Sequence, residues 1–124
     1  YGTNLLNTVT TEAAYLNRVK EGFHAVMTKS YGLGKNYIDA KYDPSGKTGT
    51  SQSFTDTDGD HVIDTPTVST AFIGYAPTTS PKMAITVTSP DSSWENPNNS
   101  YATLVTRRIS SRASSAYFNL YPLE

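Results

Sequence analysis

The sequence predicts an α+β fold in which a helix, a segment of three antiparallel strands and a C-terminal helix follow one another. Three observations support this class: an apolar stripe at helical spacing near the N-terminus, β-branched runs separated by turn signals in the middle, and a second long periodic segment near the C-terminus. With 124 residues, the chain accommodates one domain or part of one. It contains no internal repeat and no visible domain boundary.

The first helix is predicted over residues 11–29. Its apolar side chains recur at offsets of three and four, as expected of an amphipathic helix, and they are Leu16, Val19, Phe23, Val26 and Met27. Thr10 or Thr11 is the expected cap, because a hydroxyl accepts an otherwise unpaired backbone N–H. The helix should end before Gly32, and residues 30–45 should form a partly ordered loop.

Three strands are predicted in the middle of the chain. Residues 45–54 are small or β-branched, lack proline and carry two glycines that disfavour a helix. The turn signal Asp58-Gly59 predicts an extended hairpin with an acidic loop at its tip. Residues 67–75 and 82–89 are β-branched and aromatic, and the proline-containing turn at 76–81 should join them as antiparallel neighbours.

A second helix is predicted from near Asn96 toward Pro122, since asparagine can cap a helix and Pro97 is tolerated in the first turn. One broad side of this helix is dominated by apolar atoms, and the arginine stems can lie along it. The residues assigned to that side are Tyr101, Leu104, Val105, Arg108, Ile109, Arg112, Ala113, Ala116, Tyr117 and Leu120.

Composition excludes several classes of function. The formal net charge is −1 and 17% of the residues are charged, so no basic surface is available and no nucleic-acid partner is expected. The absence of cysteine excludes disulfide scaffolds, thiolate nucleophiles and cysteine-ligated metal sites. No apolar run approaches the roughly 18 residues that a membrane-spanning helix needs, so any anchor or export signal is expected outside these residues.

The most informative run is Gly46-Lys47-Thr48-Gly49-Thr50. It is not a phosphate-binding loop, because Lys41 occupies the place of the first glycine and a strand follows instead of a helix. The run resembles the Lys-Thr-Gly element of serine acyltransferases that act on penicillin-like or D-alanyl substrates. The helix before it, the next two strands with their Gly-Tyr-Ala-Pro turn, and the last helix extend the likeness over nearly the whole chain. The chain thus resembles the C-terminal part of a class B penicillin-binding protein transpeptidase domain, with its β-lactamase/transpeptidase-like fold.

The resemblance implies a role for each residue of this strand. Lys47 and Thr50 are the expected catalytic residues: Lys47 assists proton transfer and favours an anionic substrate, and the Thr50 N–H completes the oxyanion site. Thr48, Gly49, Thr50 and Gln52 are expected to bind substrate. Thr48 and Thr50 share one side of the strand with Gln52, so the two hydroxyls can bind one carboxylate. Gly49 allows an acyl group or peptide backbone to approach closely.

Two elements that the family requires are absent from these 124 residues. No Ser-x-x-Lys and no Ser-x-Asn pattern occurs, since Pro44 stands three before Lys47 and Thr79 three before Lys82. The nucleophilic serine is therefore expected on the rest of the same transpeptidase domain. Either the chain is truncated or the other piece is a separate or cleaved chain, and we favour the second because helix and sheet alone would expose apolar surface.

The resemblance also implies the reaction and its setting. It implies a peptidoglycan D,D-transpeptidase that forms an acyl-enzyme with D-Ala-D-Ala stem peptides, is inhibited by β-lactams and needs no cofactor. The expected location is the extracytoplasmic face of the cytoplasmic membrane, with an anchor upstream of this chain.

Two alternatives stay open. One is a serine β-lactamase or a β-lactam sensor, which share the Lys-Thr-Gly element and differ in how fast the acyl group leaves. The other is a non-catalytic calcium-binding module, whose carboxylates would be Asp56, Asp58, Asp60 and Asp64. The EF-hand pattern does not fit, because counting from Asp56 places His61 where glycine is needed and Thr67 where glutamate is needed. His24 and His61 have no second ligand nearby in sequence and are expected to be structural.

Overall fold

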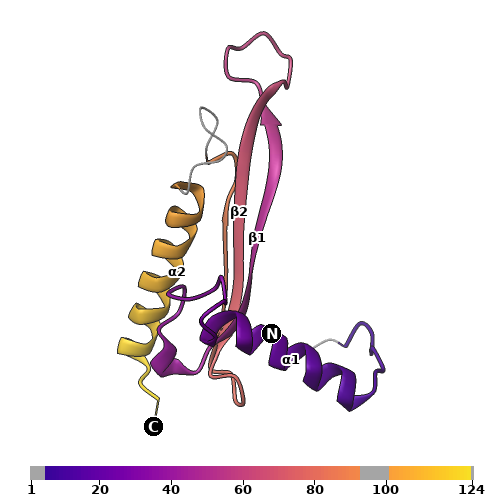
Figure 1. Ribbon diagram of the computed structural model, residues 1–124, viewed down its shortest axis with the longest axis vertical. Coiled ribbons are helices and arrows are strands. Elements are labelled where there is room, and N and C mark those ends of the chain that lie inside the picture. The colour runs from indigo at the N-terminus through magenta and orange to yellow at the C-terminus, as the bar shows by residue number, and fades with distance from the viewer. Residues whose placement is uncertain (1–4, 93–100, 124) are drawn as a thin grey trace.

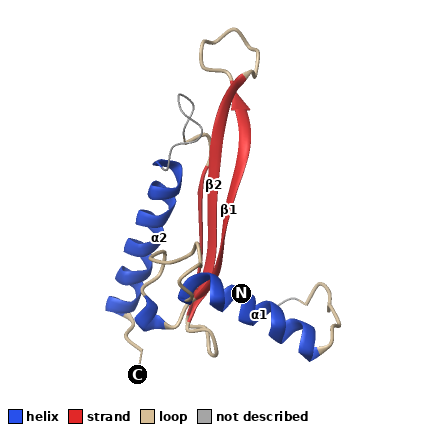
Figure 2. Ribbon diagram, in the orientation of Figure 1, coloured by secondary structure: helices blue, strands red, loops and turns tan. Residues whose placement is uncertain are grey.

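The structure of the chain, a computed structural model, describes residues 5–92 and 101–123. The helix–sheet–helix order of the predicted α+β class is confirmed (Figures 1 and 2). In chain order the elements are α1 (Ala13–Thr28), a 3-10 turn (Ala40–Tyr42), β1 (Ser45–Thr55), β2 (Thr65–Ala76), β3 (Met83–Ser89) and α2 (Tyr101–Leu120). The predicted start of the second helix, at residues 96–100, lies outside the described residues.

The sheet has the strand order β1-β2-β3, and both pairs are antiparallel. Thr50 pairs with Thr70, and Thr70 pairs in turn with Ser89, so these three positions share one face. In Figure 1, α2 runs along the sheet, α1 crosses its lower end, and the tip of the β1–β2 hairpin projects beyond both helices. The helix α2 packs against β2 and β3, whereas α1 packs against β1. Because β1 pairs only with β2 in the described sheet, it is an edge strand.

The core is centred on Phe72, whose side chain is fully buried in the middle of β2. Its ring lies 4.6 Å from the ring of Tyr37, measured between centroids. A Cβ atom on Gly74 would lie 2.6 Å from the Phe72 ring, and one on Gly46 would lie 3.0 Å from it. Because Gly46 and Gly74 are paired across the strands, both must lack a side chain for the ring to occupy this place.

The first helix is confirmed within two residues at its start and one at its end, but its cap and its burial differ from prediction. The cap is Glu12, which makes no side-chain capping hydrogen bond, so the prediction of Thr10 or Thr11 is wrong. Most of the predicted apolar stripe is exposed, because the helix packs only with its C-terminal end: Met27 is buried, whereas Val19 remains 51% exposed.

The segment predicted as a partly ordered loop contributes to the core. Tyr37 and Ile38 are 3% and 2% exposed and belong to the same apolar cluster as Phe72. Tyr42 follows in the 3-10 turn and stacks on Phe118 of α2, with 4.2 Å between ring centroids. This segment therefore joins the two helices beneath the sheet, although its sequence has no strand or helix periodicity.

The face of α2 that packs on the sheet is not the predicted one. Tyr101, Ile109 and Leu120 of the predicted face are 59%, 48% and 75% exposed. The buried side is a row of residues four apart, which are Ala102, Thr106, Ser110, Ser114 and Phe118. Residues at this spacing form one ridge of a helix surface, so the seam is continuous although it contains three hydroxyl residues.

The buried hydroxyls of α2 are hydrogen-bonded within the helix. Ser110 donates to the carbonyl of Thr106 at 2.8 Å, and Thr106 donates to the carbonyl of Ala102 at 3.2 Å. Thr70 of β2 donates to the same Ala102 carbonyl at 3.0 Å and also contacts the Thr106 hydroxyl. With their polar atoms satisfied, serine and threonine act as small spacers that let the helix approach the sheet closely.

This close approach predicts that Ser110→Leu destabilises the protein. The larger side chain should push α2 away from the sheet and lower the free energy of unfolding by about 1–3 kcal/mol. Ala113→Leu is the matched control, because it creates the same residue at an exposed position of the same helix. Urea unfolding followed by circular dichroism measures both, and equal stabilities for the two variants would contradict the observed seam.

Candidate active-site strand

The sequence run singled out above occupies the first half of β1, at the edge of the sheet. The strand is buried at Ser45 and Gly46 and becomes exposed at Lys47. Thr48 is half-buried, and the following residues through Gln52 are exposed. The buried start fixes the strand against the core, and the part with chemically useful side chains is open to solvent.

The register divides these residues between the two faces of the strand. Thr48, Thr50 and Gln52 pair with residues of β2 that are buried on the α2 side of the sheet: Phe72, Thr70 and Val68. The strand register therefore agrees with the prediction that Thr48, Thr50 and Gln52 share one face of β1. Lys47 pairs with Ile73, which is 60% exposed on the opposite face. Lys47 and Thr50 can reach one ligand only across the open edge of β1.

Lys47 lies between two open hollows. One, of about 380 Å³, separates it from the C-terminal half of α1 and is lined there by Gly22, Ala25 and Val26. The other, of about 310 Å³, lies over Gly49 and Ile73 on the outer face of the sheet. The Lys47 ammonium donates a hydrogen bond of 2.6 Å to the carbonyl of Thr48. No carboxylate pairs with it among the described residues, so its charge is available to an anion.

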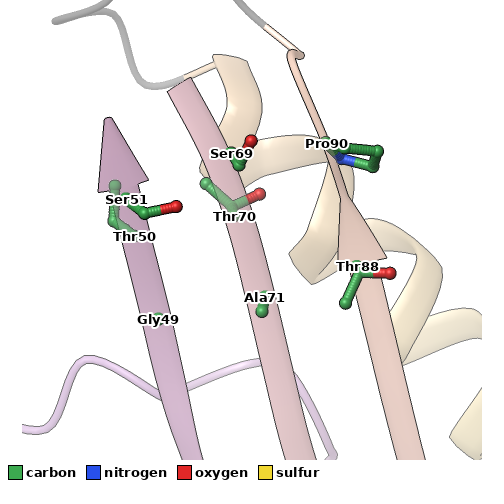
Figure 3. A pocket seen from close by; sticks show the side chains of 8 residues that line it. All are labelled: Gly49, Thr50, Ser51, Ser69, Thr70, Ala71, Thr88 and Pro90. Atoms are coloured by element: carbon green, nitrogen blue, oxygen red, sulfur yellow. The ribbon is translucent and has the colours of Figure 1, made fainter. Parts of the chain in front are cut away.

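A third hollow, of about 440 Å³, lies on the outer face of the sheet around Gly49 (Figure 3). Gly49, Ala71 and Thr88 occupy equivalent positions on the three strands, so this level of the sheet carries only small side chains. A Cβ atom on Gly49 would meet nothing closer than the Ala71 methyl at 3.8 Å. Unlike Gly46, Gly49 is therefore not required by packing within this chain.

A hydroxyl–carboxylate network closes the far end of the same face, and the sequence reasoning missed it. Asp91 follows β3 and accepts hydrogen bonds from Ser53 at 2.8 Å and Thr67 at 2.6 Å. Its backbone N–H donates to the Ser69 hydroxyl at 3.0 Å. The Thr67 hydroxyl, followed by that of Ser53, holds the pKa of Asp91 below its usual range. The network ties β1, β2 and the end of β3 together just beyond the third hollow.

The four aspartates of the alternative calcium site lie at the hairpin tip. Asp56, Asp58 and Asp60 can bring carboxylate oxygens within 4.8 Å of one another, whereas Asp64 does not join them. Asp56 accepts the backbone N–H groups of Gly59 at 2.7 Å and His61 at 2.9 Å. These bonds, led by that of Gly59, lower the pKa of the Asp56 carboxyl. They account for Asp56 as a residue that shapes the turn.

The prediction that His24 is structural is confirmed by its contacts. Its Nδ1 lies 3.1 Å from both the carbonyl of Pro44 and the hydroxyl of Thr78. His61 is exposed at the hairpin tip with φ at 67°. Neither histidine belongs to a cluster of metal-ligating side chains in the described part of the chain.

The sequence matches the family described as "Penicillin binding protein transpeptidase domain" over residues 4–111. The chain belongs to this family. The resemblance predicted from the Lys-Thr-Gly run and its surroundings is confirmed, and cell-wall synthesis is the process that the family implies.

Two relatives agree with this assignment. The transpeptidase chain is 34% identical to penicillin-binding protein 2A of Bacillus subtilis (strain 168) over 116 residues, which cover 94% of this chain and 16% of the relative. Its structure matches penicillin-binding protein 2B of Streptococcus pneumoniae (strain R6) with a TM-score of 0.72 and 25% identity, over 96% of this chain and 18% of that one. The chain thus spans less than a fifth of either protein. None of the helices described here is both long and apolar enough to cross a membrane.

The Asp91 network of the transpeptidase chain predicts a dependence of stability on pH. Because the pKa of Asp91 is lowered in the folded state, its contribution is present above the ordinary aspartate range, near pH 4, and is lost as pH falls through the folded pKa. Asp91→Asn should lower the urea midpoint at pH 7, and the difference from wild type should shrink below about pH 4. Asparagine tolerates the positive φ of 45° at this position, so backbone strain is matched.

Asp64→Asn is the control for this pH experiment. It removes the same charge, but within residues 5–92 and 101–123 the one hydrogen bond of the Asp64 side chain is a long one, of 3.5 Å, from the Thr65 hydroxyl. Its urea midpoint should stay close to that of wild type. A difference between Asp91→Asn and wild type that is the same at every pH would argue against an ionised carboxylate as the centre of the network.

Proposed function

We propose that this chain forms the C-terminal wall of the active site of a serine D,D-transpeptidase, which cross-links peptidoglycan through an acyl-enzyme and is blocked by β-lactams. The observation that carries the proposal is the placement of the Lys-Thr-Gly run on an open sheet edge, immediately after a buried anchor. Family membership supports a transpeptidase, and the exposed cation and hydroxyls support an anionic peptide substrate. The reaction belongs at the outer face of the cytoplasmic membrane, where peptidoglycan is assembled.

In this proposal the nucleophile is a serine on a part of the transpeptidase domain outside these residues. Its Oγ attacks the carbonyl carbon of the penultimate D-alanine, the peptide bond breaks, and the terminal D-alanine leaves with the proton on its amine. The amine of a second stem peptide then attacks the ester, forms the cross-link and restores the serine. A β-lactam acylates the same serine, but its leaving amine stays tethered to the opened ring.

Lys47 supplies positive charge and a path for protons at the edge of β1. Its ammonium is exposed and has no carboxylate partner among the described residues, so it is free to attract the carboxylate end of the stem peptide. Thr48 and Thr50 present hydroxyls to the other side of the same edge, as donors to that carboxylate. The ligand is thus held at the edge and contacts both sides of the strand.

Thr50 contributes its backbone N–H to the oxyanion that forms on the attacked carbonyl. Residues two apart in a strand direct their N–H and C=O groups to the same edge. The Lys47 ammonium bonds the Thr48 carbonyl, as expected of a carbonyl on the open edge, and the Thr50 N–H is then expected on that edge as well. A peptide substrate can add as an extra strand to the backbone groups of this open edge.

The exposed apolar residues support a partner segment from the same transpeptidase domain. Leu16, Val19 and Phe23 of α1 are 44%, 51% and 37% exposed, and Ile73 beside Lys47 is 60% exposed. Such surface is usual where another part of a domain packs. Since the chain spans only 16% and 18% of its two relatives, the remainder of the domain is the natural occupant, as the same or a separate polypeptide.

The central test is Lys47→Ala in the intact transpeptidase. Loss of the ammonium should slow acylation by fluorescent penicillin by roughly 100-fold or more, because a positioned proton-transfer group contributes about that factor. Lys82→Ala is the control, since Lys82 is an exposed lysine just before β3. Labelling of Lys47→Ala at the wild-type rate would falsify the assignment. Fast release of the acyl group by the wild-type protein would instead indicate a β-lactamase.

A second test distinguishes the roles of Gly46 and Gly49. Gly49→Ala should fold at least as well as wild type, because the new methyl meets only ordinary contacts, yet acylate about 10-fold more slowly because it narrows the place of substrate approach. Gly46→Ala should instead lower the melting temperature, since its Cβ would lie 2.7 Å from the Ile73 carbonyl oxygen. Melting temperature and penicillin labelling are measured on both. If Gly49→Ala were acylated at the wild-type rate, Gly49 would not be required for the approach of the substrate.

A further inference from the structure

A compact polar cluster fixes the point at which β1 begins. It joins three segments that are distant in sequence: α1 through His24, the entry to β1 through residues 43–45, and the β2–β3 turn through Thr78. Ser45 is fully buried, and Lys47 lies two residues farther along the strand. The cluster therefore sits at the base of the proposed active-site strand, on the side where α1 approaches it.

The Thr78 hydroxyl is the centre of this cluster, and all of its hydrogen-bonding capacity is used. It donates to the carbonyl of Asp43 at 2.8 Å. With its only hydrogen committed, it must accept from the Ser45 hydroxyl at 2.9 Å and from His24 Nδ1 at 3.1 Å. The Pro44 carbonyl, also 3.1 Å from Nδ1, can only accept, so the hydrogen is on Nδ1.

The backbone of Thr78 reinforces the same attachment. Its N–H donates to the Asp43 carbonyl at 2.7 Å and lies 3.2 Å from the Asp43 carboxylate. Asp43 has a positive φ of 51°, so the chain turns sharply here before it enters β1. Thr78 thus holds both the bend at Asp43 and the first strand residue, Ser45, in place. It does so through hydrogen bonds of its backbone N–H and of its hydroxyl.

We infer that Thr78 is a positioning residue for Lys47: its hydroxyl locks the entry to β1 against α1 and the β2–β3 turn, and thereby sets where the ammonium stands relative to the attacking serine. The inference rests on the proposed function of Lys47. Thr78 touches neither the substrate nor the reacting atoms in this scheme. Loss of its hydroxyl removes the acceptor of the Ser45 hydroxyl and one of the two acceptors of the His24 Nδ1–H, so the strand entry can shift by fractions of an ångström without unfolding the core.

The experiment compares Thr78→Val with Thr78→Ser in the intact transpeptidase. Valine matches the shape of threonine but lacks the hydroxyl, whereas serine keeps it. The acylation rate constant and the apparent binding constant for fluorescent penicillin are resolved by varying its concentration. Thr78→Val should lower the acylation rate constant about 10- to 100-fold, as expected of a small misplacement of a catalytic group, with a smaller change in the binding constant. Thr78→Ser should restore the rate to within about 3-fold of wild type.

Ser110→Ala is the stability control. It also removes one hydroxyl-to-carbonyl hydrogen bond, of 2.8 Å to Thr106, but this bond lies within α2 and outside the three segments that the cluster joins. At temperatures well below all three melting transitions it should acylate like wild type. Equal acylation rate constants for Thr78→Val and wild type, or an equal loss in Thr78→Ser, would overturn the inference.

The Lys47→Ala variant separates this inference from the proposed function. If Lys47→Ala is inactive and Thr78→Val is fully active, the function stands and the positioning role is wrong. If Lys47→Ala acylates normally, the proposed function itself is wrong and the positioning role is wrong with it.

Discussion

The structure depends on the packing of one aromatic ring over a pair of glycines. Phe72 is fully buried, and its ring occupies the place where side chains on Gly46 and Gly74 would lie. These glycines face each other across β1 and β2, so the contact sets the separation between the core and both the start of β1 and the end of β2. The dense packing of protein interiors makes such a contact intolerant of even one added methyl group. The start of the edge strand is therefore fixed against the core, whereas its residues from Gly49 to Gln52 are exposed.

This constraint explains how one short run can serve both the fold and the site. The first glycine of the run, Gly46, is buried under Phe72, and the next residue is an exposed lysine. Gly49 is exposed, and a Cβ atom there would meet only ordinary contacts, the nearest with the Ala71 methyl at 3.8 Å. Because side chains alternate along the strand, Lys47 and Thr48 point to opposite faces. The residues can act on one ligand only at the strand edge, where both faces and the backbone are accessible. On one face of the sheet, only every second residue of the run could contact the ligand.

The elements and their order could be predicted because their signals are local: β-branched runs, turn residues, and the three-and-four spacing of α1. The packing of α2 could not, because Thr106, Ser110 and Ser114 are polar residues by type, whereas in the structure their hydroxyls bond within the helix and their side chains occupy only small volumes. The Asp91 network was equally hidden, because Ser53 and Asp91 are 38 residues apart and meet only after β3 is placed. The placement of Lys47 on the face opposite the threonines follows from the alternation of side chains along a strand.

The two helices bind the sheet by different means, and the difference bears on where the rest of a transpeptidase domain would lie. α2 is seated along its length by small side chains with satisfied polar atoms, so it forms a closed layer with β2 and β3. α1 contributes only its C-terminal end, and Gly22 and Val26 border the hollow that holds Lys47. The exposed Phe23 follows directly, and Ile73 is exposed on the other side of Lys47. Exposed apolar surface thus lies near an ammonium that has no carboxylate partner among the described residues. A segment that buries this apolar surface would bring its own side chains against the ammonium, which is the arrangement that the proposed acyl transfer by a serine outside these residues requires.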